Sequence, residues 1–201
     1  MVERTILDYP QLTVAELSQH RLFLLRAKRI GQPQRRELER VLGAALPEEP
    51  NSSASGVGET LWLAPGQWLI RGTDAGGDIA TRIEDACRGA LFHLGDVTDA
   101  LCVFEIDGRR SEDLIAKGCS LDLHPTVFRI GQAKRSLLGQ VRILLHRLST
   151  TRYRISFDVS LRQHVLSWLE ISSEEFRHDP AVEEDAHGQH SERGVEVLQR
   201  S

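Results

Sequence analysis

The histidines of this chain are the residues best suited to bind a metal ion or transfer a proton. There are eight of them, and a zinc site would need several histidine, cysteine or carboxylate ligands brought together. Only His187 and His190 lie close together in the sequence, in a polar segment that offers no second layer of hydrogen bonds to orient metal ligands. We therefore expect solvated side chains there. His124 precedes Pro125, which favours an extended surface connection, and we expect it to have a structural or interface role.

The densest group of carboxylates around apolar strands is formed by Asp96, Asp99, Glu105 and Asp107. Paired carboxylates can act as general acid and general base when their environments differ. However, Asp96 and Asp99 flank Thr98 in an expected strand-to-strand turn, where Asp side chains accept hydrogen bonds from their own backbone. Turn formation is the favoured interpretation.

The three cysteines, Cys87, Cys102 and Cys119, are too widely spaced for a CxxC metal motif, and their odd number does not suit a disulfide framework. We expect them to be small buried hydrophobic residues. The sequence also contains no GxSxG, HExxH or Walker phosphate-binding motif. The glycine-rich residues 72–77 precede an expected helix, but Asp74 and Asp78 would repel a phosphate, so a plain turn is favoured over a phosphate site.

The composition excludes several classes of protein. The 201 residues are 40% hydrophobic, with 25 basic against 29 acidic side chains. The acidic excess lies beyond residue 172, so the remainder is nearly neutral and lacks the basic surface of a nucleic-acid-binding protein. No apolar stretch approaches the roughly 20 residues that span a bilayer, and the charged N-terminus does not suit an export signal. We expect a cytoplasmic protein without nucleic-acid or membrane partners.

The clearest structural element is a hairpin over residues 60–71, in which Pro65 and Gly66 form the turn. Trp62 and Trp68 lie on its two arms. Large aromatic residues are enriched both in cores and at protein interfaces, so both interpretations stay open. We treat Trp62, Trp68 and His124 as the candidate residues of a subunit interface.

The other elements are expected around this hairpin. Helical spacing predicts helices over 33–42, 79–87, 111–117 and 161–170, the last three capped by Asp78, Ser111 and Ser160. Strands are expected over 20–26, 90–97, 100–108, 127–130, 134–138, 139–148 and 152–159. Strands in pairs between helices favour an α+β fold, with an antiparallel or mixed sheet, βαββαβ-type units and helices packed on one face. We expect a single domain over 1–171 and an acidic, disordered tail over 172–201.

Read together, residues 60–170 resemble the gamma subunit of heterotetrameric sarcosine oxidase. The resemblance rests on LWLAPGQWLI at 61–70, DVTDALCVFEIDG at 96–108 and above all KGCSLDLHP at 117–125. The segments 141–148 and 153–160, with the helix that follows them, continue it in the expected order.

The resemblance implies a complex of alpha, beta, gamma and delta subunits that oxidatively demethylates sarcosine to glycine and reduces oxygen to peroxide. Such a complex uses FAD, FMN, NAD and tetrahydrofolate, and these cofactors and a zinc ion belong to the other subunits. The gamma subunit resembles the folate-binding domain of the glycine-cleavage aminomethyltransferase. It is expected to be structural, with no catalytic, cofactor-binding or metal-binding residues of its own.

Three alternatives remain open at this point. The chain could be a stand-alone folate-binding or folate-dependent protein of the aminomethyltransferase type. It could be the gamma subunit of a related complex that oxidises another N-methyl amino acid. A regulatory module with a small-molecule pocket has only an analogy of fold behind it.

Overall fold

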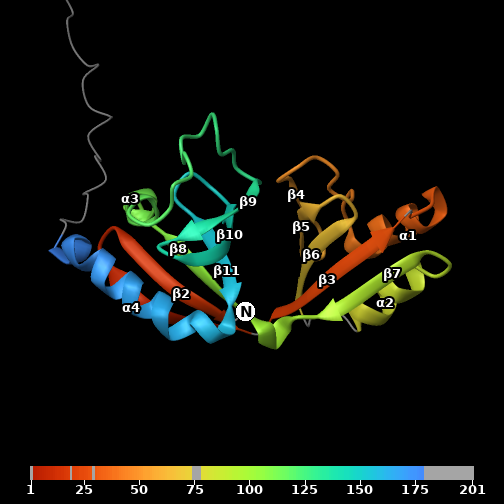
Figure 1. The fold of residues 1–201 in the computed structure, drawn as a ribbon, viewed down its shortest axis with the longest axis horizontal. Helices are drawn as coiled ribbons and strands as arrows, with labels where there is room; N and C mark the ends of the chain where they lie inside the picture. The colour runs from red at the N-terminus through yellow and green to blue at the C-terminus, as the bar shows by residue number, and fades with distance from the viewer. Residues whose placement is uncertain (1, 19, 29, 74–77, 179–201) are drawn as a thin grey trace, which may run out of the picture.

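The computed structural model describes residues 2–18, 20–28, 30–73 and 78–178, and its strands form two antiparallel sheets (Figure 1). The six-stranded sheet has the order β1 (Val2–Tyr9), β2 (Leu12–Ser18), β8 (Leu101–Asp107), β11 (Tyr153–Asp158), β10 (Val141–Arg147) and β9 (Ala133–Leu138). The five-stranded sheet has the order β4 (Ser53–Ser55), β5 (Glu59–Ala64), β6 (Gln67–Thr73), β3 (His20–Lys28) and β7 (Leu91–Asp96). The chain therefore enters the second sheet after β2 and returns to the first after β7.

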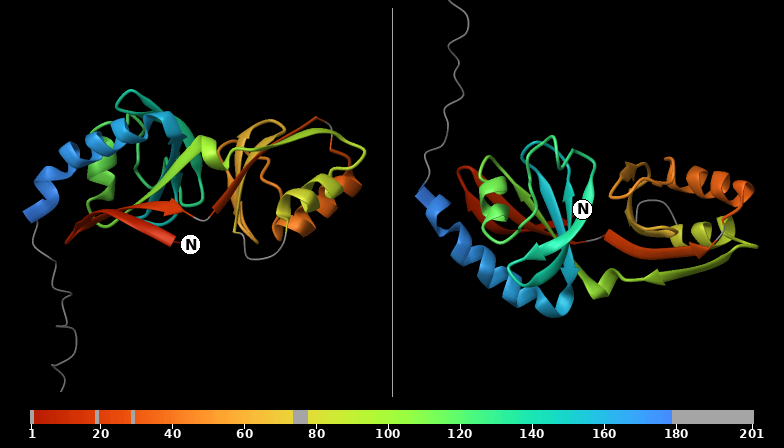
Figure 2. Two further views of the ribbon diagram at one scale, coloured as in Figure 1. Left: turned by 90° about the horizontal axis from the view of Figure 1, so that it is seen from below. Right: turned by 45° about the horizontal axis from the view of Figure 1, so that its top comes forward.

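Each sheet carries two helices on the face that points away from the other sheet (Figure 2). The helices of the five-stranded sheet are α1 (Gln32–Leu42) and α2 (Ile79–Ala86), and those of the six-stranded sheet are α3 (Ser111–Ala116) and α4 (Arg162–Ser173). The result is a helix, sheet, sheet, helix arrangement in which the two sheets form a V in Figure 1.

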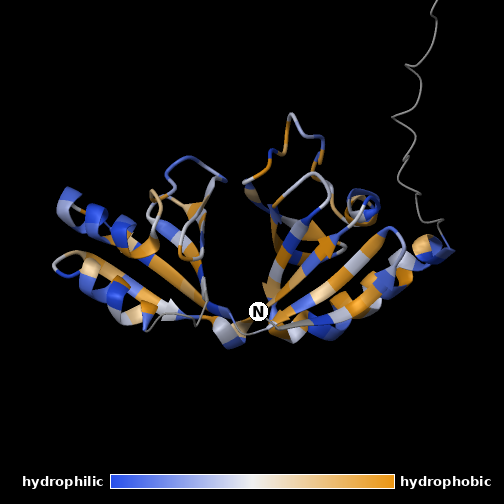
Figure 3. Cartoon of the chain, turned by 180° about the vertical axis from the view of Figure 1, so that it is seen from behind, coloured by the Kyte–Doolittle hydropathy of each residue, from blue (hydrophilic) through white to orange (hydrophobic). Residues whose placement is uncertain are grey.

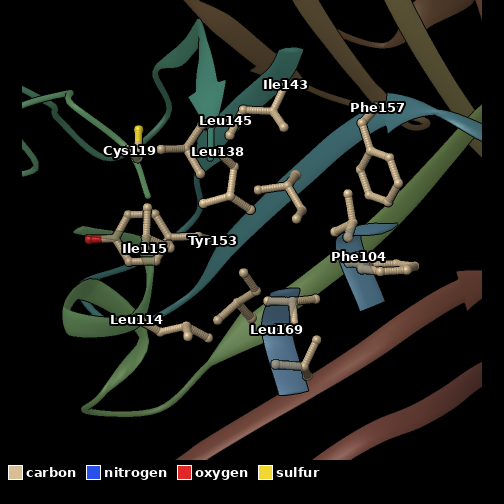
Figure 4. Packing of buried hydrophobic residues seen from close by; sticks show 14 of the residues in the cluster. Phe104, Leu114, Ile115, Cys119, Leu138, Ile143, Leu145, Tyr153, Phe157 and Leu169 are labelled. Carbon is tan, nitrogen blue, oxygen red and sulfur yellow. The ribbon is translucent and has the colours of Figure 1, made fainter. Parts of the chain in front are cut away.

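Three apolar layers hold this arrangement together. One lies between the six-stranded sheet and its helices, where Phe104 and Phe157 meet edge to face and Leu114 and Leu169 close the layer (Figure 4). The second lies between the five-stranded sheet and its helices. The third, which includes Leu61 and six other buried residues, joins the two sheets. Burial of apolar area at about 25 cal/mol per Å² makes these layers the main stabilising contribution.

The strands can serve two layers because successive side chains point to opposite faces. On β8, Cys102, Phe104 and Ile106 face the helices, whereas Val103 faces the other sheet. The strands in Figure 3 accordingly alternate between hydrophobic and hydrophilic residues along their length.

The α+β class, the antiparallel pairing and most expected elements are confirmed. The hairpin of β5 and β6 turns at Pro65 and Gly66, where Gly66 has φ 70°. Asp78 caps α2 by accepting a hydrogen bond from the backbone N–H of Thr81. The expected strand over 127–130 is wrong, because Phe128 lies in a turn closed by a backbone hydrogen bond to His124.

Two expected helix caps are also wrong. The hydroxyl of Ser111 donates to the backbone carbonyl of Thr151 and so does not cap α3. Helix α4 has no side-chain cap, and Ser160 lies in a 3-10 helix over Val159–Leu161 that precedes it, where Asp158 accepts from the backbone N–H of Ser160. Both predictions failed because a serine hydroxyl has several partners within reach of a folded chain, and sequence position alone does not choose among them.

The C-terminal end of the fold lies beyond the expected boundary at residue 171. Helix α4 continues to Ser173, and a 3-10 helix over Glu174–His178 follows it. Phe176 is buried there in the helix layer of the six-stranded sheet, and the ammonium of Lys117 lies 4.4 Å from its ring centre. The expected boundary is therefore too early, and the part of the tail from 179 on lies outside the described residues. Within those residues, no helix is long and apolar enough to cross a membrane.

Candidate functional site

The densest set of titratable side chains in the interior lies between the two sheets. We call it the inter-sheet charge cluster, and it consists of Glu59, Arg71, Glu105, His146 and Arg154. These residues come from strands β5, β6, β8, β10 and β11, so both sheets contribute. Of these five residues, only Glu105 belongs to a group that the sequence pattern singles out.

Strand register brings these side chains together. Glu59 on β5 is the direct cross-strand partner of Arg71 on β6. In the other sheet, Arg154 on β11 lies between Glu105 on β8 and His146 on β10, and it is paired in register with both. Cross-strand neighbours share one face of a sheet, so each sheet presents a ready-made row of charges to the other.

The central contact of the cluster is Glu59, whose carboxylate accepts hydrogen bonds from the guanidinium groups of both Arg71 and Arg154. Arg154 also donates from Nε to Glu105 at 2.6 Å. The side chain of Arg71 is only 8% exposed, and that of Glu59 is 19% exposed. Glu59 thus forms an ion pair that crosses from one sheet to the other. Such a pair fixes how the sheets sit on each other, because losing either partner would leave a buried charge unpaired.

The electrostatics of the cluster keep Glu59 charged and the nearby imidazoles neutral. Burial works against the ionised form of Glu59, but Arg71 and Arg154 outweigh it, so the pKa of this carboxyl lies below its usual range. Burial lowers the pKa of His146 to about 4. Burial, with repulsion from Arg71 and Arg154, also lowers the pKa of His20 at the margin of the cluster. Near neutral pH the cluster therefore contains neutral histidines beside compensated ion pairs.

Ser53, His146 and Glu59 follow one another in the order of a nucleophile, base and acid triad. The Nε2 atom of His146 lies 3.1 Å from Oγ of Ser53, and its Nδ1 lies 3.7 Å from Oε2 of Glu59. However, the hydroxyl of Ser53 donates its proton to the carbonyl of Gly131. Neutral His146 must then donate from Nε2 to Ser53, which leaves Nδ1 without a hydrogen-bond partner. This proton order is the reverse of the one a serine nucleophile needs.

The two tryptophans proposed for an interface occupy different environments. Trp68 lies in the core of the five-stranded sheet, only 6% exposed, and its indole N–H donates to the carbonyl of Pro47 at 2.7 Å. Its expected place on a docking surface is wrong, because the inward face of β6 buries it. Trp62 is half-buried against the same layer, and its interface role stays a prediction.

His124 is exposed in the loop after α3, where its Nδ1 atom lies 2.8 Å from the hydroxyl of Thr126. Its expected surface position is confirmed, and its interface role stays a prediction.

The other candidate groups have the structural roles expected of them. Asp96 accepts hydrogen bonds from the backbone N–H and the hydroxyl of Thr98 at 3.0 and 2.6 Å, which confirms turn formation. All three cysteines are buried, and burial raises the pKa of Cys87 and Cys102. No group of three metal-ligating side chains occurs within the residues that the structure describes. Residues 74–77 of the glycine-rich loop, and both tail histidines, lie outside them.

Comparison with known proteins identifies a family. The model of the sarcosine oxidase, gamma subunit family matches residues 35–175. Among curated proteins, the sarcosine oxidase subunit gamma of Corynebacterium sp. (strain P-1) is 27% identical over 147 residues, which cover 72% of each chain. The namesake from Corynebacterium sp. (strain U-96) is 29% identical over 140 residues, covering 67% of this chain and 66% of its own length.

Solved structures show the same fold. A chain of the heterotetrameric sarcosine oxidase from Corynebacterium sp. U-96 superposes with a TM-score of 0.77 at 23% identity, covering 90% of this chain and 91% of its own. The aminomethyltransferase T of the glycine cleavage system from Bartonella henselae gives a TM-score of 0.57 at 11% identity, with 81% of this chain and 46% of its own covered. On the family match, which covers most of this chain and includes strands from both sheets, this chain belongs to the sarcosine oxidase gamma subunit family.

Proposed function

We propose that this chain is the gamma subunit of a heterotetrameric sarcosine oxidase and that it acts through contacts with the other subunits. The observation that carries this proposal is the family match over residues 35–175. It is supported by the fold shared with the heterotetrameric enzyme, which extends over nine-tenths of both chains. Because the two chains are similar over nearly their whole length, we favour the same role as a subunit. Reuse of a fragment in an unrelated protein would give a shorter match.

Within the proposal, the chain supplies no catalytic residue. The polar groups of its interior neutralise one another: Glu59 is held by two arginines, and His146 donates its proton to Ser53. A general base must be basic enough and accessible enough to accept a proton from a substrate. The carboxylate of Glu59 is occupied by its arginines, and the unpartnered Nδ1 of His146 is buried and belongs to an imidazole whose pKa is lowered to about 4. The buried thiols of Cys87 and Cys102 have raised pKa values, which disfavours the reactive thiolate.

The partners would be the alpha, beta and delta subunits of a cytoplasmic complex that oxidatively demethylates sarcosine to glycine. The complex would use FAD, FMN, NAD and tetrahydrofolate. The other subunits would bind these cofactors and a zinc ion. The carboxylates of the inter-sheet charge cluster do not suit tetrahydrofolate, because Glu59 and Glu105 already pair with arginine. A carboxylate that binds a pterin ring must have free oxygen atoms.

Co-expression with the candidate partner subunits tests this proposal. With an affinity tag on another subunit, we expect this chain to co-purify in a fixed ratio and the complex to turn over sarcosine. A complex that assembles and turns over normally without this chain would contradict the proposal, as would failure of the chain to co-purify. Turnover of other N-methyl amino acids by the same preparation distinguishes a sarcosine oxidase from a related complex.

A stand-alone folate-binding function is favoured only by the fold shared with the aminomethyltransferase. Calorimetry of the isolated chain with tetrahydrofolate decides this alternative. Binding at micromolar concentration would support it, whereas the subunit proposal predicts no heat of binding in that range.

A further inference from the structure

A groove with a volume of about 300 Å³ lies between the two sheets, beside the apolar layer that joins them. Strands β3, β5 and β6 line one side, and β8 to β11 line the other (Figure 1). Its floor is apolar and is made by the leucine side chains Leu24, Leu63, Leu69, Leu101 and Leu144. Leu63 and Leu101 are only partly buried, so this apolar surface remains in contact with water. Large apolar side chains in a concave site are a common mark of a binding surface.

A β-bulge shapes this floor. The pairing of β5 with β6 passes from Trp62 opposite Trp68 to Ala64 opposite Gln67, so Leu63 is an additional residue on β5. A bulge bends its strand and re-aims the side chains next to it. Leu63 lies at this bulge, and it lines the groove while remaining only partly buried.

Two arginines stand at the rim of the groove. Arg26 and Arg135 are both exposed, and neither forms an ion pair with a described residue. The acidic side chain in the groove is Asp158, and its Oδ1 already accepts hydrogen bonds from the backbone N–H and the hydroxyl of Ser160, at 2.9 and 2.6 Å. The rim is therefore net positive, whereas the inter-sheet charge cluster deeper between the sheets is internally compensated. An apolar centre with an arginine rim is the usual composition of a protein interface.

We propose that this groove is the docking site for a segment of another subunit, one that places a large apolar side chain on the leucine floor and an adjacent carboxylate between Arg26 and Arg135. This inference rests on the proposed function and names the surface through which it is carried out. The positive rim selects the acidic character of the partner segment, and the floor selects its apolar residue. Charge pairs at such a rim mainly set association rate and salt dependence, whereas the apolar anchor sets the lifetime of the complex.

Charge reversal in the complete complex tests the rim. We expect R26E/R135E to weaken binding of this chain to the other subunits by about tenfold or more, and to remove most of the salt dependence of association. The matched control is R36E/R82E, the same change in charge on exposed arginines of helices α1 and α2. The melting temperature of each isolated variant serves as a folding control. Equal affinities for R26E/R135E and wild type would overturn the proposal.

Site-specific cross-linking tests the occupant. A benzophenone amino acid in place of Ala100, which lines the groove and is exposed, should cross-link the purified complex to a segment of another subunit that contains an apolar residue next to Asp or Glu. Cross-links only within this chain, or to a second copy of it, would overturn the proposal. If the chain co-purifies with its partners but these results fail, the docking site is wrong and the proposed function stands. If it does not co-purify at all, the proposed function itself fails.

Discussion

Protonation of His146 should make the stability of this protein depend on pH in a predictable way. The imidazole is buried between the sheets, and burial lowers its pKa from 6.5 to about 4, against the attraction of Glu59 and with added repulsion from Arg71 and Arg154. The unfolded chain binds a proton near pH 6.5, whereas the folded chain does so only near pH 4. The free energy of unfolding should therefore fall as the pH drops through this window, by ~2 kcal/mol between about pH 7.5 and about pH 5 from this one group.

Urea unfolding of wild type and of His146→Gln at these two pH values measures this contribution. Glutamine can still donate a hydrogen bond to Ser53 but cannot take up a proton, so the variant should lose ~2 kcal/mol less than wild type on acidification. His20, whose pKa is lowered for the same reason, keeps its own share of the slope in both proteins. The control variant is His93→Gln, the same substitution at an exposed histidine. Parallel loss of stability in wild type and His146→Gln would refute the assignment of a buried neutral imidazole.

Three further predictions concern stability, and urea unfolding measures each. Glu59→Gln should destabilise the protein by about 3–5 kcal/mol, because it leaves two buried guanidinium groups without their shared carboxylate, whereas Glu37→Gln at an exposed pair should have a much smaller effect; equal effects would contradict a role for the cluster in joining the sheets. Trp68→Ala should destabilise the isolated chain by about 3–5 kcal/mol, and clearly more than Trp62→Ala, because Trp68 is buried in the core and Trp62 is only half-buried. The reverse ranking would contradict the placement of Trp68 in the core. Phe176→Ala should also lower stability by about 3–5 kcal/mol, although the residue lies in a segment that composition places in the tail; an unchanged midpoint would show that this segment does not belong to the fold.

Local patterns in the sequence predicted the elements whose signals are themselves local. Three features depend only on residues a few positions apart: the turn at Pro65 and Gly66, the capping carboxylate of Asp78 and the apolar stripe of α1. The local sequence is therefore sufficient to predict them. The Asp96 turn was predictable for the same reason. The family resemblance over 117–125 also agrees with the comparisons.

The two-sheet architecture and the inter-sheet charge cluster could not be predicted in this way. Alternation along a strand says that one face is polar, but it does not say whether that face meets water or a second sheet. Glu59, Arg71 and Arg154 follow the pattern of solvent-facing residues, and only long-range pairing brings them together in the interior. Strands β1 and β2 were missed because their charged residues, such as Glu3 and Glu16, interrupt the apolar signal.

Native mass spectrometry of the co-expressed complex tests most directly whether this chain is a subunit held in a sarcosine oxidase complex. We expect an assembly that contains one copy of this chain with the three other subunits, and loss of that assembly when the chain is omitted. An intact, active complex that forms without this chain would contradict it.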